Sequence, residues 1–108
     1  QELLKRYVLY AGELPAGPSC FETFPQAVAC ALAGQLVSAK QKRRVRRSLL
    51  MQAGIDIRDL TNIDKVDAAL CALAAHAFTR GRFVRYGVAD DGFVIVPDAA
   101  PPAVQIAR

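Results

Sequence analysis

Two acidic side chains in apolar surroundings are the first residues of this sequence whose type and spacing could do chemistry. Glu22 is the only carboxylate in the segment Cys20–Phe24. Asp67 stands in the stretch Val66–Phe78, where His76 is the only other polar or charged residue. Carboxylate oxygens are the ligands that Mg²⁺ prefers. A carboxylate at a strand end and one at a helix edge could therefore share a metal ion.

Helix capping is a second interpretation of the acidic residues Asp64 and Asp67. Acidic groups near a helix N-terminus interact favourably with the helix dipole, and the three-residue spacing resembles a capping arrangement. On a helix, Asp67 shares a side with Leu70, Cys71 and Ala74. Its carboxylate should therefore lie beside packed residues, and the spacing leaves both the capping and the metal role open.

Glu22 and His76 also have structural interpretations. With strand alternation Glu22 points away from Phe21, as a polar residue on the open face of an edge strand would. His76 follows Asp67 by nine residues and faces nearly the opposite way on a helix. We therefore expect His76 to be a structural or surface residue.

Six basic residues within eight positions are the second chemical feature: Lys40, Lys42, Arg43, Arg44, Arg46 and Arg47. On a helix they cannot all point one way, but together they create a strong positive field. Such a run is commonly a solvated helix face. The alternative is contact with a phosphate backbone, which would make binding salt-dependent and independent of base sequence. No glycine-rich phosphate loop accompanies the run, so the cluster suggests nucleic acid and leaves the solvated face open.

The bulk composition indicates one small folded domain. The chain has 108 residues, of which 53% are hydrophobic and 22% charged, with a net charge of +4. The longest apolar run, 25–37, is too short to span a bilayer, so we expect no membrane protein. The three cysteines form no CxxC pair, which favours reduced thiols and a cytoplasmic location. Because the sequence starts at Gln1, we expect a processed product or a fragment.

Turn residues and periodicity predict the elements that must position these groups. We expect a strand over 20–24, followed by a helix that starts at Pro25 and ends at Gly34. A second helix should cover about 39–53 and carry the basic cluster.

The strongest local pattern predicts a third helix over 63–79, capped by Asn62 or Asp64. A β-hairpin should follow, with strands at 82–88 and 93–97. Residues 1–10 could be the end of a helix or a short strand, and we expect 98–108 to be a flexible tail. The fold class is therefore α/β, mostly helical, with one central strand and a C-terminal hairpin.

Three segments, in this order, resemble one family, domain of unknown function 429, whose members are predicted nucleases with a ribonuclease H-like fold. Phe21–Ala27 resembles its strand-to-helix junction, and Val66–Ala75 its Asp-Ala-hydrophobic helix. Tyr86–Gly87 with Gly92–Pro97 resembles its closing hairpin, although Phe93 stands where tryptophan is usual.

The resemblance implies that the chain is the C-terminal part of a ribonuclease H-like domain. Glu22 matches a strand glutamate and Asp67 a helix aspartate that bind Mg²⁺ in such nucleases, with Asp64 as a weaker candidate for an added ligand. The implied chemistry is metal-assisted phosphodiester hydrolysis, with the basic cluster steering the nucleic acid. No segment matches the first-strand aspartate of the family, so the resemblance leaves a missing segment and a non-catalytic half both open.

Three hypotheses follow for the function. The leading one is an incomplete Mg²⁺-dependent nuclease, with Glu22 and Asp67 as catalytic metal ligands. The second is a non-catalytic nucleic-acid or protein interaction module, and the third is a small helical domain of unrelated function. Half a sheet should expose strand edges and apolar surface, so we also expect pairing with a missing N-terminal half or self-association through Phe21 and Phe24.

Overall fold

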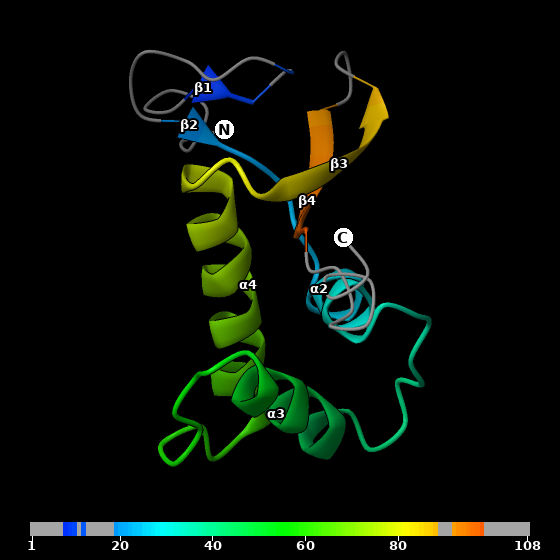
Figure 1. Ribbon diagram of the computed structural model, residues 1–108, viewed down its shortest axis with the longest axis vertical. Helices are drawn as coiled ribbons and strands as arrows, with labels where there is room; N and C mark the ends of the chain where they lie inside the picture. The colour runs from blue at the N-terminus through cyan, green and yellow to red at the C-terminus, as the bar shows by residue number, and fades with distance from the viewer. Residues whose placement is uncertain (1–7, 11, 13–18, 89–91, 99–108) are drawn as a thin grey trace, which may run out of the picture.

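One long helix organises the protein, and the other elements pack along it (Figure 1). The computed structural model describes residues 8–10, 12, 19–88 and 92–98. The elements are β1 (Val8–Leu9), β2 (Ser19–Cys20), α2 (Pro25–Ala33), α3 (Lys42–Gln52), α4 (Ile63–Thr79), β3 (Phe83–Val88) and β4 (Gly92–Pro97). The predicted mixed α/β class with a C-terminal hairpin is confirmed.

Helix α2 begins and ends where its sequence predicts. Pro25 occupies the first turn, where a missing N–H is not needed, and Phe24 before it is extended. Gly34 adopts a left-handed conformation with φ 73, and its N–H donates to the carbonyl of Cys30 at 2.9 Å. A residue with a Cβ is strained in this conformation, which explains why glycine ends the helix.

Helix α3 starts three residues later than expected, at Lys42. Gln41 before it is left-handed with φ 53, and a right-handed helix cannot continue through such a residue. The predicted start near Ala39 is therefore wrong. As a result, Lys40 lies in the connection that leads to the helix.

Helix α4 has the predicted bounds. The side chain of Asn62 caps it by accepting a hydrogen bond from the N–H of Lys65 at 2.9 Å. Asp64 lies exposed in the first turn, where its charge interacts favourably with the helix dipole. Of the two expected caps, Asn62 is the one that makes the bond.

The main hydrophobic core joins the three helices to β4. Its buried residues are Val28, Leu50, Val66, Leu70, Ala74 and Val96. A second cluster at the other end of α4 contains Tyr10, Phe78 and Ile95. Burying a side chain such as Leu, Val, Ile or Phe contributes about 1.5–3 kcal/mol to the stability of the fold. These two clusters fix how α2, α3 and the hairpin sit on α4.

The expected strand over 20–24 is shorter than predicted. Only Ser19–Cys20 forms a strand, parallel to β1, and Glu22 adds a single bridge to Val94 of β4. The carbonyl of Glu22 accepts from the N–H of Ile95 at 2.8 Å, but the carbonyl of Ile95 accepts from the hydroxyl of Thr23 at 2.6 Å. Because a side chain replaces the backbone donor, the ladder stops after one bridge.

Phe21 and Phe24, through which self-association is expected, differ in exposure. Phe21 is partly buried in the second cluster, with its ring centroid 4.8 Å from that of Phe78. Phe24 is 52% exposed. The predicted hairpin turn at 89–91 and the tail beyond residue 98 lie outside the described residues. None of the helices described is long and apolar enough to cross a membrane.

Candidate nucleic-acid interface

The helix divides the basic cluster into an interior part and an exposed part. Arg46 belongs to the interior and is 6% exposed. Its Nη1 donates to Oδ1 of Asp67 at 2.6 Å, and its Nη2 donates to Oε1 of Gln26 at 2.8 Å. We therefore correct the expectation that Arg46 faces a phosphate backbone, because its guanidinium is buried between three helices.

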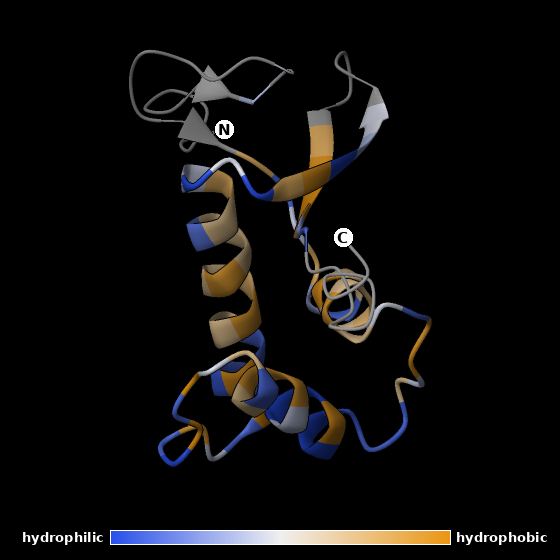
Figure 2. Cartoon of the chain, viewed as in Figure 1, coloured by the Kyte–Doolittle hydropathy of each residue, from blue (hydrophilic) through white to orange (hydrophobic). Residues whose placement is uncertain are grey.

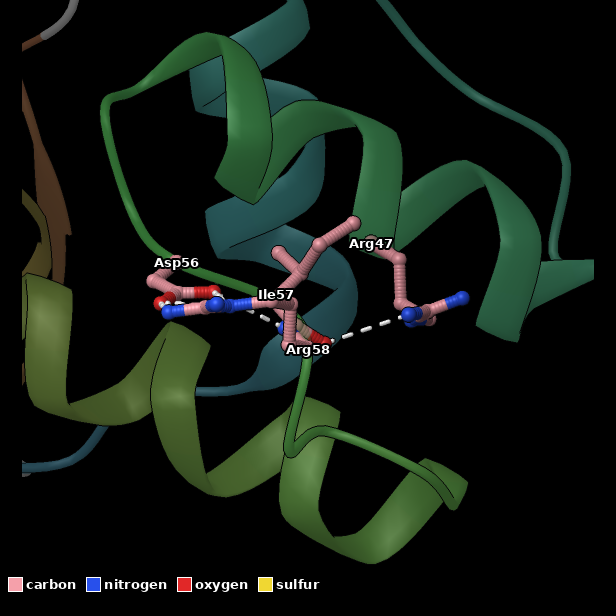
Figure 3. Close-up of polar contacts among 4 residues, drawn as sticks. All are labelled: Arg47, Asp56, Ile57 and Arg58. Atoms are coloured by element: carbon pink, nitrogen blue, oxygen red, sulfur yellow. Dashed lines mark hydrogen bonds and ion pairs between the residues drawn. The ribbon is translucent and has the colours of Figure 1, made fainter.

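Arg47 is half-buried and holds the loop that follows α3 (Figure 3). Its Nη2 donates to the carbonyl of Ile57 at 3.1 Å. The neighbouring Asp56 and Arg58 form an exposed ion pair with an Nη2–Oδ2 distance of 2.7 Å. Hydrogen bonding to Arg58 lowers the pKa of Asp56, and the same contact raises the pKa of Arg58. The main role that the contacts show for Arg47 is to anchor this loop.

The remaining four cations are exposed at the N-terminal end of α3: Lys40, Lys42, Arg43 and Arg44. Arg44 donates through Nε to Oε1 of Gln41 at 3.0 Å, and Arg43 makes a 3.3 Å contact with the carbonyl of Thr61. Within the described residues none of the four forms an ion pair with a carboxylate. Figure 2 shows this end of α3 in the colours of hydrophilic residues. We call these four residues the α3 cationic surface.

The electrostatics of this surface are unfavourable for the isolated helix. The first turn of α3 contains no acidic residue, and the side chain of its N-cap residue Gln41 makes no capping hydrogen bond to a backbone N–H. A cation near a helix N-terminus faces the positive end of the dipole and costs about 0.3–1 kcal/mol. The α3 cationic surface is therefore arranged to attract an anion and not to stabilise its own helix.

Glu22 and Asp67 share no hydrogen bond among the described residues, and their surroundings differ. Glu22 is exposed beside β4, and its neighbour Phe21 packs on Phe78 near the C-terminal end of α4. Asp67 lies eleven residues before Phe78. At 1.5 Å per residue Asp67 lies about 16 Å from Phe78 along the helix axis. Asp64 is exposed one turn nearer the start of α4.

Glu22, Asp64 and Asp67 are the three carboxylates for which a metal-ligand role is predicted. In the part of the chain that the structure describes, no group of three or more His, Cys, Asp or Glu residues could hold a metal ion. One oxygen of Asp67 already bonds a guanidinium, which competes with any metal for the same negative charge. The metal-ligand roles of Glu22, Asp67 and Asp64 therefore stay predictions from the family resemblance.

Sequence reasoning missed the contact between Arg46 and Asp67, although part of its signal was present. Arg46 precedes the buried Leu50 by four residues, and Asp67 precedes the buried Leu70 by three. These spacings place each charged residue on the buried side of its helix. Two opposite charges on the buried sides of neighbouring helices are a pattern that predicts an interhelical pair.

An apolar groove between α2 and the hairpin was also not expected from the sequence. It has a volume of ≈ 780 Å³ and is lined by residues of α2, β3 and β4. Phe24, Leu36 and Tyr86 line it and are 52%, 91% and 61% exposed. None of the candidate acidic residues Glu22, Asp64 and Asp67 lines this groove, so it is separate from the predicted chemistry.

Cys71 gives a testable prediction about this part of α4. Burial raises the pKa of its thiol above the ordinary value of 9.0, and the charge of Asp67 raises it further. Less thiolate is then present at about pH 8, and thiolate is the nucleophile. We expect iodoacetamide to alkylate Cys71 more slowly than free cysteine at this pH, with a rate that continues to rise above pH 9. Peptide mass spectrometry measures both rates, and equal rates would contradict the prediction.

The fold and the surface together define a small mixed α/β protein with a basic helix. Residues 2–91 match the sequence profile of the family described as "Protein of unknown function (DUF429)". The chain therefore belongs to this family. No curated protein and no solved structure matches the chain.

Proposed function

We propose that this protein binds nucleic acid through the phosphate backbone, with the α3 cationic surface as the contact. The observation that carries the proposal is the exposure of four cations without a carboxylate partner in the described structure. They stand where a helix dipole already favours negative charge. A polyanion would compensate this charge, and the chain's own described residues do not.

The chemistry of the surface predicts how the binding would behave. Lys and Arg contact phosphates without reading base edges, so affinity should depend on salt and little on sequence. If each of the four cations neutralises one phosphate of a duplex, log K should fall with log salt with a slope of about −3 to −4. The α3 cationic surface therefore supports binding of nucleic acid in general, without preference for a base sequence.

A pair of charge-matched variants tests the proposal. Lys40 and Lys42 donate no side-chain hydrogen bond within the described structure, so replacing both with glutamine removes charge without breaking such a bond. We expect K40Q/K42Q to weaken oligonucleotide binding about tenfold or more and to reduce the salt slope by about 2. Fluorescence anisotropy with a labelled duplex measures both quantities.

The control removes two cations that lie outside the α3 cationic surface. Arg80 and Arg82 are exposed and lie close to the C-terminus of that helix. We expect R80Q/R82Q, with the same loss of charge, to bind nearly as well as the wild type. Equal losses in the two double variants would show a net-charge effect and would contradict a contact at α3.

The second proposal is Mg²⁺-dependent phosphodiester hydrolysis. It is supported by the order of the three segments that resemble predicted nucleases and by the exposed carboxylate of Glu22. In such an enzyme Mg²⁺ activates water and stabilises the leaving oxygen. Acidic ligands besides Glu22 and Asp67 would be required, and the ion pair of Asp67 favours the first proposal.

A cleavage assay separates the two proposals. Glu22→Gln is the informative variant, because its side chain is exposed and the exchange keeps its size. Under the second proposal the protein cleaves oligonucleotides with Mg²⁺ but not with EDTA, and Glu22→Gln lowers the rate at least a hundredfold. Under the first proposal it binds without cleaving, and Glu22→Gln binds as the wild type does.

A further inference from the structure

Three helices meet at the guanidinium of Arg46. Gln26 of α2 accepts from Nη2 and Asp67 of α4 accepts from Nη1, at 2.8 and 2.6 Å. The side chain of Arg46 is 7% exposed and that of Asp67 is 26% exposed. The guanidinium is therefore the cation to which the carboxylate of Asp67 is bound.

We infer that Arg46 takes the place of a divalent cation at Asp67. In this interpretation Asp67 is the counter-charge of a buried structural arginine. The described part of the chain then binds no Mg²⁺ through Asp67 while Arg46 is present. The inference concerns this carboxylate alone and does not depend on nucleic-acid binding.

The local chemistry makes the two cations competitors for the charge of one carboxylate. A charge-assisted hydrogen bond of 2.6 Å is at the short end of such contacts, so Oδ1 is strongly engaged. Nε of Arg46 is buried and has no partner among the described residues, so the guanidinium would keep only the neutral Gln26 oxygen as an acceptor if Asp67 turned to a metal.

Removing the guanidinium should make the carboxylate of Asp67 available to a metal ion. Arg46→Met keeps a long, unbranched side chain between the helices but leaves the carboxylate of Asp67 without its cation. We expect this variant to have a higher Tm in MgCl₂ than in NaCl of equal ionic strength, because Mg²⁺ then binds a carboxylate that has lost its cation. The wild type should show no such difference.

Paramagnetic broadening by Mn²⁺ tests the inference in the absence of nucleic acid. Trace Mn²⁺ is titrated into ¹⁵N-labelled protein, and the amide signals of 66–68 are compared with those of the rest of the chain. We expect no selective broadening at 66–68 in the wild type. In Arg46→Met these signals should broaden selectively and recover with excess Mg²⁺.

Two results would overturn the inference. One is selective broadening at 66–68 in the wild type, which would make Asp67 a metal ligand beside Arg46. The other is a folded Arg46→Met that shows no selective broadening. If this variant does not fold, the wild-type titration decides alone. A failure of oligonucleotide binding leaves this inference untouched, because no oligonucleotide is present.

Discussion

Replacing Asp67 with alanine is expected to lower the free energy of unfolding by about 3–5 kcal/mol. The change leaves Arg46, which is 6% exposed, without its counter-charge. The hydrogen bond to Gln26 remains, but a neutral amide oxygen does not compensate a buried positive charge. The loss should therefore exceed what a missing carboxylate would cost on the surface.

Urea unfolding followed by circular dichroism measures this loss. The control is Asp64→Ala, which removes an exposed carboxylate one turn away and should cost about 1 kcal/mol or less. The double variant Arg46→Met/Asp67→Leu removes both charges and should recover most of the stability. A cost for Asp67→Ala no larger than that for Asp64→Ala would contradict the role of the pair.

Replacing Leu70 with alanine is the second change with a large expected effect, a loss of about 2–5 kcal/mol. Leu70 is fully buried in the cluster that joins all three helices to β4. The substitution removes apolar contacts and leaves a cavity that the fixed helix packing closes only in part. We expect the urea midpoint to fall while the dependence on urea concentration stays unchanged.

Leu36→Ala is the matched control for Leu70→Ala, because Leu36 is 91% exposed. It deletes the same atoms at a position outside the core, where substitutions usually change stability by less than about 0.5 kcal/mol. Similar losses for the two variants would mean that Leu70 does not lie in the core as described.

The elements that the sequence predicted correctly are those with local signals. Helix α4 has a cap at Asn62, a glycine at Gly81 and a regular apolar face, and its bounds agree with the prediction. The start of α3 was wrong because the left-handed Gln41 carries no signal that a glycine or an asparagine would give. The strand over 20–24 was too long because its pairing depends on Ile95, 72 positions from Thr23.

For the candidate site, too, the local features could be predicted from the sequence and the tertiary contacts could not. The positive charge of α3 is readable from composition, and the exposure of Lys42 and Arg43 agrees with a surface. Arg46 is buried because of the way the helices pack. This packing brings its Nη1 within 2.6 Å of Oδ1 of Asp67, which is 21 positions away in the sequence. Charge counting treats these arginines and lysines alike, and only the fold tells them apart.

The most direct test of the central claim is the position of the nucleic-acid contact on the chain. We would titrate ¹⁵N-labelled protein with a short duplex at low salt and follow every amide signal. The account predicts shifts that cluster at 40–44 and are reversed by added salt. Shifts confined to the groove lined by Phe24 and Leu36, or no shifts at all, would contradict it.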